Sequence, residues 1–206
     1  NSAGDRAPDI HAGTLKAFVE ALADLKREGH LLAYHDRGDG GLLATVAEMA
    51  FAGHSGVSLD LDAIVGEGGD LAALFAEELG AVVQIPQGAR QTVIAILRAH
   101  GLDGYAHPIG VLNDDDEVRI VRRGKTIFAA PRAALQRAWS EVSYQIAKIR
   151  DDAACAQQEF DDITAHNPGL SVSLSFDASE DTVAPLIATG VRPRIAILRE
   201  QGVNSQ

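Results

Sequence analysis

The sequence predicts an α+β fold in which helices cover a mostly antiparallel or mixed sheet, and three observations support this prediction. Several segments repeat apolar residues with helical spacing, and shorter apolar or alternating runs between them predict strands. Strands and helices do not alternate strictly, and one strand pair forms a hairpin around Arg123-Gly124. The apolar fraction of 46% and the charged fraction of 23% are ordinary for a soluble globular protein.

The first half of the chain contains most of the expected elements. The segment from Thr14 to Glu28 places its apolar residues on one helical face, with Thr14 as a candidate cap and Gly29 at the exit. Asp70 is expected to cap another helix. In chain order, we expect helix 14–28, strand 31–35, helix 42–52, strand 57–61, helix 71–79, strand 81–85, helix 91–100 and strand 109–112.

The hairpin, with strands 118–121 and 126–128, is followed by a long helix whose first turn contains Pro131. An apolar stripe runs along this helix, and we expect it to pack into the core. The stripe consists of Leu135, Trp139, Val142, Ile146 and Ile149.

After Phe160 the pattern changes to an irregular connector over residues 161–190. Within it, the alternating run 172–176 is a candidate for pairing with a sheet. Residues 194–198 resemble a new strand, which suggests the start of a truncated further domain.

The charge and cysteine content exclude some functions. A net charge of −11 argues against nucleic acid or an anionic membrane as the main partner, because both require a basic face. The single cysteine, Cys155, forms no intrachain disulfide, which fits a reducing, cytoplasmic location. Cys155 lies in an acidic helical stretch that would not activate a thiolate, so we reject it as a nucleophile.

The stretch "HDRGDGG", residues 35–41, joins a predicted strand to a predicted helix. Its glycines allow close approach of the backbone, and the helix N-terminus favours anions. Asp36 and Asp39 are oxygen ligands suited to Mg²⁺, and Arg37 can pair with a phosphate. The loop lacks the lysine of a Walker A motif. From these residues alone, a plain turn, a phosphate and metal cradle, and an Arg-Gly-Asp adhesion tripeptide all stay open.

For His35, and for the acidic pair Glu77 and Glu78, we expect simpler roles than ligand binding. His35 follows an apolar strand, and we expect a hydrogen-bonded histidine at the strand end rather than a metal ligand. Glu77 and Glu78 close a predicted amphipathic helix, where exposure to solvent is the default.

Four stretches in order carry a family resemblance. They read "LLAYHDRGDGGLLATVAEMAFAGHSGV", "LFAEELGAVVQI", "NPGLSVSLSFD" and "IATGVRPRIAILREQGVNS". They closely resemble the large, single-chain bacterial phosphoribosylformylglycinamidine synthase, from about Leu15 to Ser205. The resemblance implies a fragment with three parts. Residues 1–130 would form a C-terminal domain of the aminoimidazole-ribonucleotide-synthetase type, residues 131–190 the long helix and connector, and residues 191–206 the first strand of a glutaminase domain.

The resemblance also implies the chemistry. Such enzymes use ATP, Mg²⁺ and ammonia from glutamine to convert formylglycinamide ribonucleotide to formylglycinamidine ribonucleotide in purine biosynthesis. It assigns Asp36 as a Mg²⁺ ligand and places Gly38 where the family has a nucleotide-contacting serine. It assigns no catalytic residue to this chain. The preceding synthetase domains and the following glutaminase domain would be its partners, and the chain alone would show no turnover. The alternative is a structural nucleotide-binding module.

Overall fold

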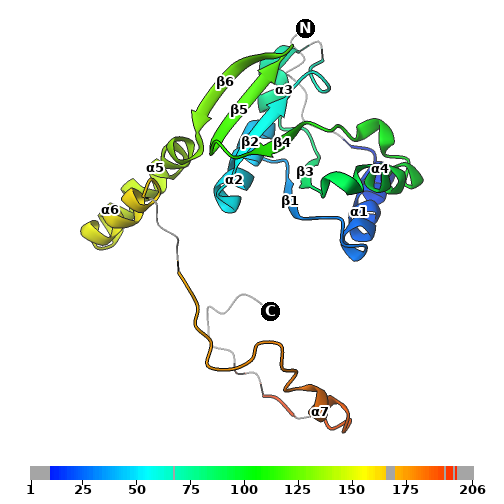
Figure 1. Ribbon diagram of the computed structural model, residues 1–206, viewed down its shortest axis with the longest axis vertical. Coiled ribbons are helices and arrows are strands. Elements are labelled where there is room, and N and C mark those ends of the chain that lie inside the picture. Colours follow the sequence, from blue (N-terminus) through cyan, green and yellow to red (C-terminus); the bar gives the residue numbers. More distant parts are fainter. Residues whose placement is uncertain (1–9, 67, 166–169, 193, 197, 199–206) are drawn as a thin grey trace. The chain divides into compact units, whose positions relative to one another are not determined.

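The computed structural model describes residues 10–66, 68–165, 170–192, 194–196 and 198. The chain divides into two units, residues 1–166 and 167–206, and each is described by itself (Figure 1). No helix among the described residues has the length and apolar character needed to cross a membrane.

A four-stranded mixed sheet forms the centre of the first unit (Figure 1). Its strands, in the spatial order β4-β2-β5-β6, are Gly110–Asn113, Gly56–Asp60, Glu117–Arg122 and Lys125–Pro131. The pair β2 and β5 is parallel, and the two outer pairs are antiparallel. The hairpin between β5 and β6 turns at Arg123 and Gly124, which both have positive φ. This sheet and its helices confirm the predicted α+β class.

A separate two-stranded ribbon pairs β1, Ala33–Asp36, with β3, Ala81–Gln84, in antiparallel register. Asp36 faces Ala81 across the ribbon, and Ala33 faces Gln84. The ribbon therefore fixes the point at which the chain leaves β1 for the glycine-containing loop.

The helices of the first unit are α1 Ala12–Arg27, α2 Gly41–Gly53, α3 Gly69–Phe75, α4 Arg90–Ala99, α5 Arg132–Arg150 and α6 Ala153–Asp162. Most of them lie within two residues of the predicted ranges, but α3 ends at Phe75, so the prediction that Glu77 and Glu78 close this helix was wrong. Short 3₁₀ turns, Gln87–Ala89 and Asp103–Tyr105, flank α4. Two predicted caps were wrong. His11, rather than Thr14, accepts the first-turn hydrogen bond of α1, and α3 starts after Gly68 with Asp70 inside its first turn.

The core lies between the four-stranded sheet and the helices α2 and α3. Two clusters of buried side chains fill this space. The first is Leu42, Val46 and Leu59, and the second is Leu61, Leu74 and Ile120. Because Leu42 and Val46 are one turn apart on α2, the beginning of this helix is anchored directly on the sheet.

The predicted core role of the α5 stripe was wrong. Trp139, Val142, Ile146 and Ile149 are 60%, 69%, 56% and 87% exposed in the described structure. Of these four residues, Trp139 still contacts α2 through Phe51 and Glu48. Other contacts of α5 come from positions off the stripe, because Arg132 is buried and Tyr144 stacks on Phe160 of α6. A helical period identifies an apolar face but does not specify what covers it.

The second unit contains one short helix, α7 Ala184–Ile187, among its described residues. The alternating run 172–176 was predicted as a possible strand, and it has no strand structure. Residues 194–196 and 198 of the expected new strand also have none, while Ile197 lies outside the described residues. The stretches Asn167-Pro168-Gly169 and 199–206, which carry part of the family resemblance, lie outside them as well.

Candidate nucleotide and metal site

The loop between β1 and α2 is held by the segment that follows α3. The main-chain N–H of Arg37 donates to the Gly80 carbonyl at 2.8 Å, and its Nη2 donates to the Ala76 carbonyl at 2.5 Å. Burial lowers the pKa of the Arg37 guanidinium. The arginine expected to pair with a phosphate therefore clamps the loop onto residues 76–80.

Two glycines at the start of α2 are required by the backbone. Gly40 and Gly41 have φ values of 81° and 68°, which disfavour any side chain. A Cβ on Gly41 would lie 2.7 Å from the Phe75 carbonyl carbon and 2.8 Å from the Leu74 carbonyl oxygen. The Gly40 N–H donates to Glu77 Oε1 at 3.0 Å, so this acid helps close the loop. Glu77 is exposed, as predicted, and it also accepts this hydrogen bond, which the sequence did not predict.

Gly38 has a different environment. Its φ is not in the left-handed region, and a Cβ added there would meet nothing within 4 Å. Neither packing nor backbone conformation requires glycine at this position. The loop therefore has room for a Cβ at this position.

Asp36 lies at the end of β1 with a side chain that is 78% exposed. Tyr34 lies two residues earlier on the same face of the strand, and burial together with the Asp36 charge raises the pKa of its phenol. Within the described ranges, no group of three His, Cys, Asp or Glu side chains is arranged to hold a metal ion. Since Mg²⁺ often binds through one or two carboxylates with water and phosphate oxygens, Asp36 fits a single protein ligand in such a site.

Residues 9–123 match the family model described as AIR synthase related protein, C-terminal domain. This match covers more than half of the 206-residue chain. The chain belongs to this family. The strand, loop and helix that carry Asp36 and Gly38 all lie inside the matched range.

Solved structures share the fold of this family domain. Thermotoga maritima PurL complexed with ATP matches with a TM-score of 0.53 and 24% identity over 58% of this chain and 21% of that chain. T. maritima PurL complexed with FGAR matches with a TM-score of 0.54 and 25% identity over 64% of this chain and 23% of that chain. T. maritima phosphoribosylformylglycinamidine synthase II matches with a TM-score of 0.56 and 23% identity over 62% of this chain and 22% of that chain. The chain thus spans less than a quarter of the length of these proteins.

A polar network joins His35 and Glu48, which lie inside the matched range, to Trp139 of α5, which lies outside it. The His35 Nδ1–H donates to the main-chain carbonyl of Asp36 at 2.7 Å, and His35 Nε2 lies 2.8 Å from Glu48 Oε2. The Trp139 Nε1–H donates to Glu48 Oε1 at 3.1 Å. The prediction of a hydrogen-bonded His35 is confirmed. Sequence reasoning missed Glu48, although it is the one charged residue in the apolar helix α2.

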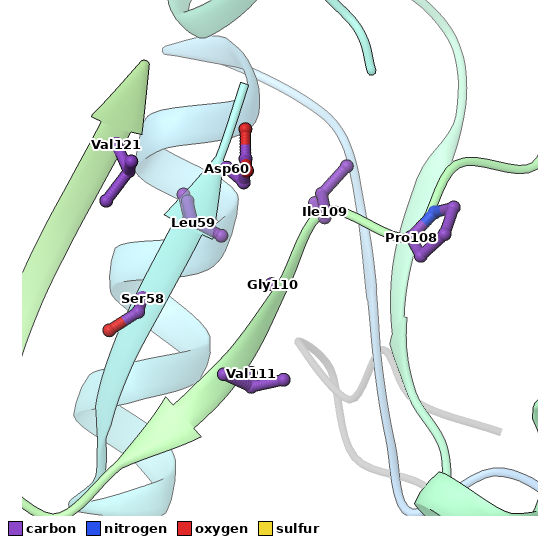
Figure 2. A pocket seen from close by; sticks show the side chains of 8 residues that line it. All are labelled: Ser58, Leu59, Asp60, Pro108, Ile109, Gly110, Val111 and Val121. Atoms are coloured by element: carbon purple, nitrogen blue, oxygen red, sulfur yellow. The ribbon is translucent and has the colours of Figure 1, made fainter. Parts of the chain in front are cut away.

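A shallow depression of about 370 Å³ lies elsewhere in the domain, where β2, β4 and β5 meet (Figure 2). Its lining is mostly apolar, and Asp60 is the one carboxylate among the residues that Figure 2 labels. None of residues 35–41 lines it. The depression and the loop are therefore distinct features, and the predicted site residues belong to the loop.

Proposed function

We propose that this domain forms one wall of an ATP·Mg²⁺ site in a longer phosphoribosylformylglycinamidine synthase. In this proposal Asp36 is one Mg²⁺ ligand, and the main chain at Gly38 faces the nucleotide phosphates. The observation that carries it is the exposed Asp36 carboxylate directly before a glycine loop whose surface is open at Gly38. Membership of the family and the ATP and FGAR named for the T. maritima PurL structures support it.

The chemical role of the site follows from charge. Bound Mg²⁺ would neutralise phosphate charge as ATP activates the amide oxygen of formylglycinamide ribonucleotide and ammonia then displaces phosphate. Asp36 would orient the ion, and the preceding synthetase domains would supply its remaining protein ligands. The Gly38 N–H would replace the hydroxyl donor that the family serine provides. Residues 131–190 would connect this domain to a glutaminase domain that starts near residue 191.

The alternative is a structural site that retains nucleotide and metal to stabilise the fold. Substituting Asp36→Asn in the full-length protein separates the two functions, with Asp114→Asn, which neutralises an exposed acid outside the loop, as a matched control. A catalytic site predicts a loss of turnover of at least about tenfold in D36N with an almost unchanged Tm. A structural site predicts the reverse pattern.

Calorimetric titration of ADP with Mg²⁺ tests the binding itself. We expect D36N to weaken Mg²⁺-dependent ADP binding in the full-length protein, and D114N to leave it unchanged. Equal binding by wild type and D36N would contradict the assignment of Asp36. Substituting Gly38→Ser is expected to tighten ADP binding, because the open space there accepts the hydroxyl group.

A further inference from the structure

We propose that Glu48 is a positioning residue that couples the long helix α5 to the end of β1 and to the loop over residues 36–41. Through it, a change in the position of α5 changes the geometry of the loop. The role of this coupling in regulating a nucleotide site rests on the proposed function, whereas the coupling itself does not.

The proposal stands on a continuous hydrogen-bonded path between three elements. Both carboxylate oxygens of Glu48 are engaged, Oε1 by Trp139 of α5 and Oε2 by His35 of β1. The path continues from His35 Nδ1–H to the carbonyl of Asp36. Each step is 3.1 Å or shorter. Glu48 therefore holds α5 at one oxygen and the strand that carries the candidate ligand at the other.

Packing keeps the two ends of this path in place. The Trp139 ring lies 5.9 Å from the Phe51 ring, and Phe51 follows Glu48 by three residues on α2. Trp139 is thus attached to α2 by an aromatic contact and by its indole N–H. The helix α2 begins at Gly41, inside the loop, and its first turns pack on the sheet. The loop is consequently fixed between β1 and α2, the two elements that Glu48 joins.

The environment of Glu48 suits a positioning role. Its side chain is 32% exposed, and the helix around it has no other charged residue. Its two hydrogen bonds hold the carboxylate between α5 and β1, and no second charge on α2 competes for the same partners. Solvent access limits the strength of each hydrogen bond, so the coupling is of moderate size.

The test uses Trp139→Phe, which removes the indole N–H and keeps an aromatic ring against Phe51. Tyr144→Phe is the matched control, because it removes a polar group from another aromatic side chain of α5 whose partners, Gln157 of α6 and Lys148 of α5, lie outside the path. Hydrogen exchange of the Arg37, Gly40 and Gly41 amides reports on the loop, since all three are hydrogen-bonded.

We expect W139F to accelerate exchange at these three amides about three- to tenfold and Y144F to leave them unchanged. E48A is expected to act at least as strongly as W139F. E48Q is expected to retain much of the protection, because its amide oxygen can still accept from Trp139 and its NH₂ group can donate to an unprotonated His35 Nε2 in place of the bond that the carboxylate accepts. Equal exchange in W139F, Y144F and wild type would overturn the coupling, and so would equal acceleration in E48Q and E48A.

Calorimetry of ADP with Mg²⁺ on the same proteins keeps the two proposals distinguishable. If wild type binds no ADP but W139F opens the loop, the proposed function fails and the coupling stands. If wild type binds ADP but W139F leaves loop exchange unchanged, the coupling fails and the proposed function stands.

Discussion

Replacing Gly41 by alanine is the most direct test of how the loop is built. The new Cβ would lie within 3 Å of main-chain atoms of Leu74, Phe75 and Ala76, none of which can rotate away. The φ of 68° adds a second penalty of about 1–2 kcal/mol for a residue with a side chain. Overpacking against a fixed backbone costs about 1–3 kcal/mol. Together they predict a loss of about 2–5 kcal/mol in the free energy of unfolding.

Urea unfolding followed by far-ultraviolet circular dichroism measures this loss. Gly38→Ala is the matched control three residues earlier, where a Cβ meets nothing within 4 Å. We expect G38A to change the free energy of unfolding by less than about 0.5 kcal/mol, or to raise it slightly by restricting the unfolded chain. If G41A and G38A had equal stability, the close approach of the loop to the end of α3 would be refuted.

Two further predictions concern charge and exposure. The Arg123 N–H and the Arg122 guanidinium lower the pKa of Asp62, so this carboxylate stabilises the fold above its ordinary pKa of 3.8 and loses its effect as pH falls through the lowered value. Acid titration of the unfolding midpoint should therefore show a shallower decline for D62N than for wild type, and identical curves would exclude this contribution. In urea unfolding, I149S should change the free energy of unfolding by less than about 0.5 kcal/mol, whereas I120A should lower it by about 2–5 kcal/mol. A large loss in I149S would show that the α5 stripe is covered.

Local signals in the sequence were sufficient for most of the fold. The apolar period of α2 and the alternation of β2 predict these elements to within one or two residues, because each pattern depends only on neighbours along the chain. The hairpin at Arg123-Gly124 likewise follows from its turn residues. The predicted strand 31–35 and helix 42–52 accordingly place Asp36 and Gly41 within one residue of the observed strand end and helix start.

Contacts between distant segments could not be predicted in the same way. The clamp of Arg37 on Ala76 joins residues that are 39 positions apart, and no periodicity encodes that distance. The bond from Trp139 to Glu48 spans 91 positions. The prediction that the α5 stripe packs into the core was wrong for the same reason. The period of a helix shows which face is apolar, but which element covers that face depends on the tertiary structure.

These distant contacts change the view of the loop as an anion cradle. The sequence suggests a run of main-chain donors around three glycines, but Arg37 N–H donates to Gly80, and Gly40 N–H donates to Glu77. A phosphate group that binds the Gly40 N–H would have to displace the Glu77 carboxylate, which already accepts this hydrogen bond. The negative charges of the phosphate and of Glu77 would also repel each other. Approach at Gly38 meets no such competitor, since the space there is open. Under the proposed function, a nucleotide phosphate would therefore approach the loop at Gly38 rather than at Gly40.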